Sequence, residues 1–394
     1  MTAQLALGCE SGGREAGNEA PGLENPGHRD RRRDIGKRRE GRRSWISGSI
    51  ADTVWAVVPR FASCVLRRPF TTTHRNLGPP REFWATSVGL GGYNANVRTM
   101  RTIDRDFESR GTRCAGTLYL PDGLECPPAI VLAHGFGAER AWGLPAFAER
   151  FVQAGFAAFL FDYRGFGDSD GEPRRVVAPR KHRQDIRAAV EHVRHFDEID
   201  AERLVLWGTS LGGGHALTIA AHDASFSALI AHVPHVDAVA SLVALGEPAH
   251  ALRLMAAGAR DIFHAATLRE PYYIDNVGQP GDLAMLNTED SYEGMLSLLS
   301  PGEPFDNRCA ARIALTFSFY RPVVHAAKIR TPTLIVAAVQ DSLIPIEAVR
   351  KTATRIPDCK LVELDCPHFA PYTGEWFERS ISAQLSFLRE RLGG

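Results

Sequence analysis

The sequence predicts an α/β fold built on a mostly parallel, doubly wound sheet. Short, continuous apolar runs, as expected for strands buried on both faces, alternate with segments that have helical periodicity. The run Leu204-Val205-Leu206 leads into a glycine-rich turn and then into an alanine-rich stretch, which is the order strand, turn, helix. A chain of 394 residues is long enough to enclose such a sheet between two helical layers.

The predicted elements follow one another regularly along the chain. Alternating residues over 102–108 and 112–120 predict an antiparallel pair of strands, closed by the turn signal Pro121-Asp122-Gly123. Further buried strands are expected at 129–133, 156–161, 204–206, 228–231, 333–338 and 360–364, and helices at 145–153, 184–196, 346–355 and 375–392. The crossovers between parallel strands are expected to be right-handed.

The alternation of strand and helix stops between residues 238 and 328. Helical segments at 239–245 and 249–259 are followed there by a region that is rich in aromatic residues and punctuated by Gly and Pro. We therefore expect residues 100–237 and 329–394 to form two parts of one core, with 238–328 as a helical cap insertion.

Residues 1–99 differ in composition from the rest of the chain. They are rich in Gly, Arg, Glu and Pro, and a basic run over 29–43 is interrupted by acidic residues. This pattern predicts a disordered, solvated extension rather than a nucleic-acid or membrane contact. An alternative is a mis-assigned upstream start, because Met100 stands immediately before the first convincing strand pattern.

Charge and cysteine content narrow the class of protein. The chain has 46 basic and 46 acidic residues, so its net charge favours neither nucleic acid nor an anionic membrane as a partner. Its seven cysteines include no Cys-x-x-Cys pair, which argues against a disulfide framework and against a zinc site. We expect a cytoplasmic protein without a metal or other cofactor. Export is a weaker alternative, since Asp52 and Arg60 interrupt the apolar stretch that follows the twin-arginine-like pair Arg42-Arg43.

Ser210 is the candidate nucleophile. It lies in Gly208-Thr209-Ser210-Leu211-Gly212, at a bend where the two glycines omit β-carbons that would crowd the turn. A serine hydroxyl needs a base that removes its proton and an acid that holds this base in the right tautomer. Asp341 follows the strand at 333–338 and His368 follows the strand at 360–364, so all three would emerge at the carboxyl edge of the sheet. The sequence therefore predicts a Ser210, His368 and Asp341 triad.

Several motifs accompany these residues. They are His134-Gly135-Phe136-Gly137, Asp162-Tyr163-Arg164-Gly165-Phe166-Gly167-Asp168-Ser169, Gly208-Thr209-Ser210-Leu211-Gly212, Gln340-Asp341 and Pro367-His368-Phe369. With these motifs, the sequence from about Ile103 onward resembles the α/β-hydrolase superfamily. Within it, the chain is similar to bacterial hydrolases of the serine aminopeptidase, X-Pro-dipeptidyl-peptidase-like and acetylxylan esterase type, and to fungal polyketide acyltransferases and thiohydrolases.

The resemblance implies a role for each matching residue. Ser210 would be the nucleophile, His368 the general base and acid, and Asp341 the acid that orients the histidine. The backbone N–H groups of Phe136 and Leu211 would form the oxyanion hole.

Two other residues compete for places in the triad. His134 lies in a His-Gly-x-Gly loop, where a structural hydrogen bond that shapes the loop is the more common role. Asp365 lies at the same strand end as His368, so Asp341 is the better placed acid.

Other polar residues are interpreted as structural. Asp162 and Arg164 are expected to tie the loop after their strand to neighbouring elements. His232 and His235 either face the pocket or are satisfied core histidines, of which the second is the more common outcome. The histidines on the predicted helix around residue 190 are expected at the surface, and these are His182, His192 and His195.

The expected activity is that of a cofactor-free serine hydrolase, which cleaves a carboxylic ester or thioester of a small molecule through an acyl-enzyme. One alternative is an acyltransferase, in which an alcohol or amine replaces water, and another is a peptidase that uses the same triad. A third is a binding module that retains the fold without catalysis. The sequence identifies neither the acyl group nor the oligomeric state, and a homodimer stays open.

Overall fold

The computed structural model describes residues 99–393, and the predictions for the N-terminal extension and its export-like segment lie outside these residues. The strands of the central sheet are β1 (Met100–Asp104), β4 (Gly116–Pro121), β5 (Pro128–Ala133), β6 (Ala157–Phe161), β7 (Asp200–Thr209), β8 (Ala228–His232), β12 (Thr333–Ala338) and β13 (Cys359–Leu364). Their order across the sheet is β1-β4-β6-β5-β7-β8-β12-β13. β4 runs antiparallel to both β1 and β6, whereas all other neighbouring pairs are parallel. The prediction of a mostly parallel sheet is confirmed.

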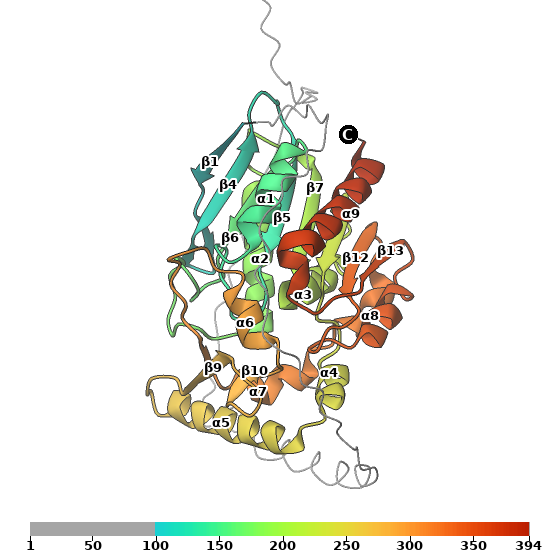
Figure 1. Ribbon diagram of the computed structural model, residues 1–394. Helices are drawn as coiled ribbons and strands as arrows, with labels where there is room; N and C mark the ends of the chain where they lie inside the picture. Colours follow the sequence, from blue (N-terminus) through green and yellow to red (C-terminus); the bar gives the residue numbers. More distant parts are fainter. Residues whose placement is uncertain (1–98, 394) are drawn as a thin grey trace, which may run out of the picture. The chain divides into compact units, whose positions relative to one another are not determined.

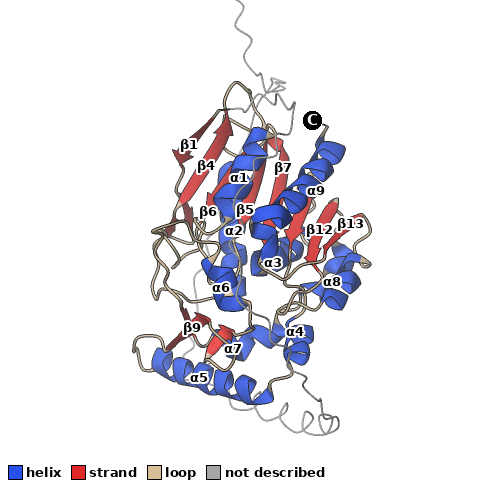
Figure 2. Cartoon of the chain, in the orientation of Figure 1, coloured by secondary structure: helices blue, strands red, loops and turns tan. Residues whose placement is uncertain are grey.

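Helices cover both faces of this sheet (Figure 1). α1 (Leu144–Gln153) and α9 (Gly374–Leu392) lie on one face, and α2 (Pro179–Val193), α3 (Leu211–Ala220) and α8 (Ile346–Ala353) lie on the other. β6, β8 and β12 are buried at every residue, as their continuous apolar composition requires. The doubly wound arrangement is therefore confirmed, and Figure 2 shows the strands flanked by helices.

The start of the core differs in detail from the prediction. Instead of one antiparallel pair, the segment forms two, because β1 pairs with β4 while β2 (Phe107–Ser109) pairs with β3 (Thr112–Cys114). The turn between β2 and β3 is made by Arg110 and Gly111, which both have positive φ. The alternation of the sequence does not change where β1 gives way to β2 or where β3 gives way to β4. The pattern therefore does not reveal where the pairing partner changes.

Aromatic packing holds the first and last helices of the core against the strand that leads to Ser210. The ring of Phe147 on α1 lies 5.1 Å from Trp207 on β7 and 4.9 Å from Phe377 on α9. The indole N–H of Trp207 donates a 2.7 Å hydrogen bond to Gln384 of α9. The end of β7 is thus fixed by packing and by a satisfied buried hydrogen bond.

The insertion between β8 and β12 contains both helices and strands. Its helices are α4 (Ala238–Leu245), α5 (Pro248–Ala266), α6 (Ser291–Leu296) and α7 (Ile313–Thr316), and its sheet has the order β10 (Ala284–Leu286), β9 (Tyr273–Val277), β11 (Arg308–Ala310). The sequence predicts the first two helices but not this sheet. Two of its strands have three residues, which is too short for alternation to distinguish them from loop.

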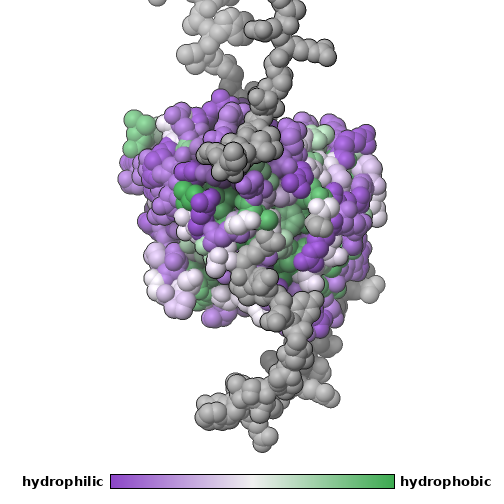
Figure 3. Space-filling view, turned by 90° about the horizontal axis from the view of Figure 1, so that it is seen from above, coloured by the Kyte–Doolittle hydropathy of each residue, from purple (hydrophilic) through white to green (hydrophobic). Residues whose placement is uncertain are grey.

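Polar and apolar residues are distributed unevenly over the face of the molecule that Figure 3 shows. Seen from above in Figure 3, polar residues form most of the rim, and apolar residues lie nearer the centre. Among residues 99–393, no helix is both long and apolar enough to pass through a bilayer.

Candidate active site

Ser210 occupies a sharp turn between β7 and α3. Its backbone has φ 51° and ψ −119°, a conformation that non-glycine residues rarely adopt outside functional sites. Backbone hydrogen bonds hold the turn: the Ser210 N–H donates to His232, and its carbonyl accepts from Gly214 and from His235 at 2.8 Å. The strained serine is therefore held by the strand and the loop that lie beside it.

The two glycines of the motif are required by close backbone approach. A β-carbon on Gly208 would lie 2.3 Å from the carbonyl oxygen of Gly212. One on Gly212 would lie 2.4 Å from the carbonyl oxygens of both Ala133 and His134. Because backbone atoms cannot move aside as a flexible side chain can, only glycine allows β5, β7 and α3 to meet this closely.

His368 and Asp341 form a buried pair. Their side chains are 2% and 3% exposed, and the Nδ1 atom of His368 lies 2.6 Å from Oδ2 of Asp341. The other oxygen of Asp341 accepts from the backbone N–H groups of Leu343 and Ile344, both at 2.8 Å. Asp365, the competing acid, instead accepts a hydrogen bond from the side chain of Gln340. The carboxylate is thus fixed from one side while it orients the imidazole from the other.

The His134–Gly137 loop passes directly beside the serine. A β-carbon on Gly135 would lie 3.2 Å from Cβ of Ser210 and 3.7 Å from its Oγ. Phe136 is the next residue of this loop, and Leu211 is the first residue of α3. Within residues 99–393, neither backbone N–H donates a hydrogen bond. For Leu211 this is usual, because the first N–H groups of a helix have no partner within it.

Ser210 and His368 line one pocket. The residues around it are Gly135, Phe136, Ala138, Trp142, Leu144, Thr209, Ser210, Leu286, Met295, Leu298, His368, Phe369 and Tyr372. Leu286, Met295 and Leu298 belong to the insertion, so the insertion forms part of the pocket wall. Most of the lining away from the two polar groups is apolar, which suits an apolar group of a substrate.

Buried hydrogen bonds and neutral histidines surround this pocket. Tyr372 and the Thr209 hydroxyl are hydrogen-bonded, and Thr209 also meets Nδ1 of His232 at 3.0 Å. Burial lowers the pKa of His134 and of His232 to about 3, and that of His235 to about 4. These three imidazoles are therefore neutral at pH 7, and among residues 99–393 none of them is hydrogen-bonded to Asp341.

The prediction that His182 lies at the surface is wrong. It is 2% exposed, and its ring stacks on Tyr163 with the centroids 4.2 Å apart. The signal was its helical spacing, because Ile186, Ala189 and Val193 lie on the same buried face of α2. His195 is exposed, as predicted, and His192 is half-buried.

His182 belongs to a buried polar chain that sequence patterns do not reveal. Its Nδ1 lies 3.4 Å from Nε2 of His215, whose Nδ1 lies 2.8 Å from the Tyr320 hydroxyl. That hydroxyl also donates to the carbonyl of Leu211, the residue after Ser210. These linked polar side chains connect α2, α3 and the end of the insertion, which lie far apart in sequence.

Asp162 and Arg164 tie the loop after β6 to neighbouring elements, as predicted. Asp162 is paired with Arg140 and also accepts from the backbone N–H of Asp168. Arg164 donates to Asp185 of α2 at 2.5 Å. Among residues 99–393, no group of three or more His, Cys, Asp or Glu side chains is arranged to hold a metal ion.

Comparisons with known proteins agree with this fold. Residues 126–293 match the family model described as serine aminopeptidase, S33. The chain is 36% identical over 298 residues to the quorum-quenching protein AidA of Acinetobacter baumannii, covering 76% of this chain and 98% of AidA. The solved structure of the α/β hydrolase GrgF from a Penicillium species has a TM-score of 0.65 at 24% identity, and the match covers 75% of this chain and all of GrgF. The chain belongs to the α/β-hydrolase family.

This α/β hydrolase is also similar to enzymes named for group transfer. It is 27% identical over 303 residues to the polyketide transferase ATR5 of Stachybotrys chlorohalonatus, a match that covers 75% of the hydrolase and 99% of ATR5.

Proposed function

We propose that this α/β hydrolase cleaves a carboxylic ester or thioester of a small molecule through an acyl-enzyme on Ser210. One observation carries the proposal: the strained Ser210 and His368 line a single pocket, and buried Asp341 is paired with that histidine. A hydroxyl, a base and an orienting carboxylate are the three groups that nucleophilic acyl transfer requires.

Each group has a distinct part in the proposed reaction. Asp341 holds the Nδ1–H of His368, which leaves Nε2 free to accept the proton of the Ser210 hydroxyl as Oγ attacks the carbonyl carbon. The N–H groups of Phe136 and Leu211 would stabilise the oxyanion of the tetrahedral intermediate. His368 then protonates the leaving alcohol or thiol, and the acyl group stays on Oγ.

Water completes the cycle by the same route. His368 removes a proton from water, the resulting hydroxide attacks the acyl carbonyl, and the proton returns to Oγ as the carboxylic acid leaves. The half-reactions balance without a cofactor, because each bond formed to the acyl carbon replaces one that breaks.

The pocket lining favours an apolar acyl group. Ala138, Trp142 and Leu144 of the core face the same space as Met295 and Leu298 of the insertion. An apolar wall stabilises aliphatic or aromatic acyl chains by burying them, at about 0.8 kcal/mol per methylene.

Acyl transfer to an alcohol or amine is a second candidate on the same triad. The named activity of ATR5 supports it, as does the mostly apolar lining of the pocket at Ser210. Product analysis of reactions that contain a competing alcohol separates the two candidates, since a hydrolase forms mainly the free acid.

The test of the proposed nucleophile is the Ser210→Ala variant. We expect its kcat/KM for a p-nitrophenyl ester to fall by roughly a thousandfold or more while its thermal unfolding stays near that of the wild type. A fluorophosphonate probe should label the wild type and not the variant. Ser297→Ala, which removes an exposed hydroxyl of the insertion, is the matched control and should keep full activity. Retained activity or labelling in Ser210→Ala would exclude the proposal.

A further inference from the structure

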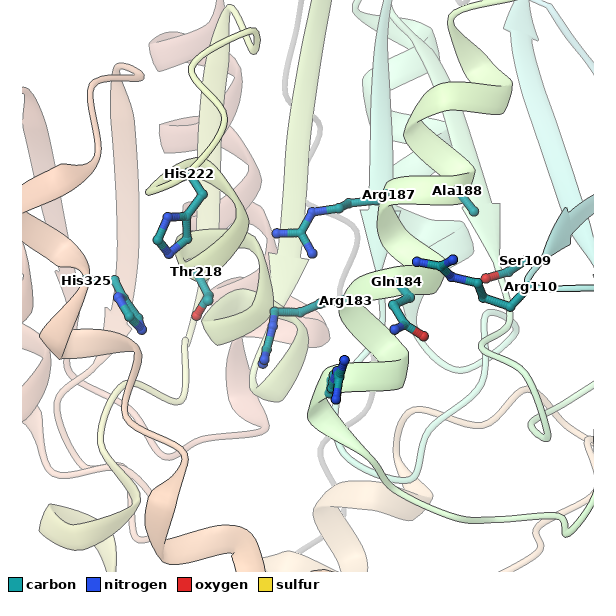
Figure 4. Close-up of a pocket in the computed structure, with 10 residues that line it drawn as sticks. Ser109, Arg110, Arg183, Gln184, Arg187, Ala188, Thr218, His222 and His325 are labelled. Atoms are coloured by element: carbon teal, nitrogen blue, oxygen red, sulfur yellow. The ribbon is translucent and has the colours of Figure 1, made fainter. Parts of the chain in front are cut away.

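A second pocket lies beside α2, and it shares no lining residue with the pocket at Ser210 (Figure 4). Positive side chains dominate it. Arg180, Arg183 and Arg187 come from α2, and Arg110 comes from the turn between β2 and β3. His222 and His325 complete its basic lining. We call this set of six residues the arginine pocket.

The four arginines lack internal partners among residues 99–393. None of their guanidinium groups has a carboxylate oxygen within 4.0 Å, and none donates a hydrogen bond to the described chain. Neighbouring arginines behave differently: Arg164 pairs with Asp185 of α2 at 2.5 Å, and Arg194 reaches Glu191. The nearby carboxylate of Asp185 is therefore already paired with Arg164 and does not neutralise the arginines of the pocket.

The positions of Arg180, Arg183 and Arg187 on α2 destabilise this helix in the absence of a bound anion. The first turn contains no acidic residue but does contain Arg180, next to the positive end of the helix dipole. Burial lowers the pKa of Arg183, and repulsion from Arg187 and Arg180 adds to this effect. A bound anion would relieve the repulsion and interact favourably with the dipole.

The arginines that line the pocket come from more than one segment. Positions 180, 183 and 187 are spaced three and four residues apart, so they lie along one face of α2. Figure 4 shows Arg183 and Arg187 extending from α2 on the side where Thr218 and His222 lie, and Arg110 beside Gln184. The rings of His222 and His325 lie 5.2 Å apart at the far side.

We propose that the arginine pocket binds a small anion that carries two or more phosphate groups. Four guanidinium groups supply far more charge than a single carboxylate would neutralise, and their planar forks match phosphate oxygens bidentately. A concave site fits a compact ligand better than it fits a nucleic-acid backbone, which needs an extended basic track.

The proposal is independent of the chemistry at Ser210. α3 begins directly after Ser210, and Thr218, in the lining of the arginine pocket, is eight residues farther along. At 1.5 Å per residue, about 12 Å of helix separates them, so the anion would bind away from the ester carbonyl.

Calorimetric titration of the full chain with sodium tripolyphosphate, at constant ionic strength, tests the proposal. We expect saturable binding of one ligand, and at least tenfold weaker binding of inorganic phosphate. The double variant Arg183→Gln/Arg187→Gln should raise the Kd for tripolyphosphate at least tenfold, and Arg110→Gln at least threefold. Arg389→Gln, which removes an exposed arginine of α9, should change it less than twofold. Ser210→Ala should bind as the wild type does.

Thermal unfolding checks that the variants are folded. Without ligand, Arg183→Gln/Arg187→Gln should unfold at or above the wild-type temperature, because like charges have been removed. No saturation by about 1 mM tripolyphosphate, an affinity that is weak even for a small ligand, would overturn the proposal. Equal losses in the pocket variant and in Arg389→Gln would overturn it too. So would tighter binding of a single-stranded oligonucleotide through the same arginines.

Discussion

Asp341 and Asp365 both lie near His368, in space or in sequence, but their carboxylates have different hydrogen-bond partners. Asp341 meets Nδ1 of the histidine at 2.6 Å and is itself held by two backbone N–H groups. Asp365 is only three residues from His368 in sequence, yet its carboxylate faces Gln340. Sequence proximity therefore says little here, whereas the strand that each residue follows decides which carboxylate reaches the imidazole.

This difference gives a prediction for a matched pair of variants. Asp341→Asn should lower kcat by roughly a thousandfold or more, because an amide can donate to Nδ1 and thereby stabilise the wrong tautomer of His368. Asp365→Asn removes the same charge nearby and should stay within about threefold of the wild type, since surface polar contacts contribute little. Steady-state kinetics on one p-nitrophenyl ester compares the two. Similar losses in both variants would contradict the assignment of Asp341.

At the scale of elements, the candidate pocket depends on one short helix of the insertion. α6 places Met295 in the pocket wall and leads to Leu298, while Glu293 on the same helix is exposed. The helix is anchored where Ser291 and Thr288 hydrogen-bond at 2.6 Å. A change of side-chain volume on its inner face should therefore alter the space available to an acyl chain without moving Ser210.

The corresponding prediction concerns chain length. Leu298→Trp should leave kcat/KM for an acetate ester within about threefold of the wild type but lower it about tenfold or more for an octanoate ester, because the larger ring fills acyl space. Glu293→Trp adds the same ring on the exposed side of α6 and should preserve the ratio between the two esters. A series of p-nitrophenyl esters of increasing length measures this ratio. An unchanged ratio in Leu298→Trp would place the acyl group elsewhere.

At the scale of the molecule, the regular parts of the fold were predictable. Continuous apolar runs mark the parallel strands, and the motifs after them place Ser210, Asp341 and His368 at one edge of the sheet. The sheet of the insertion was not predictable, because its three-residue strands are defined by their partners. The arginine pocket was hidden for a similar reason: an arginine on a polar helix face looks the same whether or not a carboxylate from another element meets it.

The insertion and the core are joined by one buried charge. Arg175 is 5% exposed and lies 2.5 Å from Glu139, which follows the loop beside Ser210. The same guanidinium reaches Asp306 of the insertion at 3.1 Å and donates to the carbonyl of Gly137. Burial raises the pKa of Glu139, and the charge of Arg175 opposes this rise. The insertion therefore adds a second carboxylate to a buried cation that is already paired within the core.

Removal of this cation should be costly. Arg175→Met leaves Glu139 buried without its partner, so we expect a loss of about 3–5 kcal/mol in the free energy of unfolding, measured by urea titration at pH 7. Addition of Glu139→Gln should recover part of that loss, because the second change removes the unpaired charge. Arg308→Met removes an exposed partner of the same Asp306 and should cost less than about 1 kcal/mol. A cost for Arg175→Met no larger than that of Arg308→Met, or strict additivity with Glu139→Gln, would contradict the stabilising role of this buried pair.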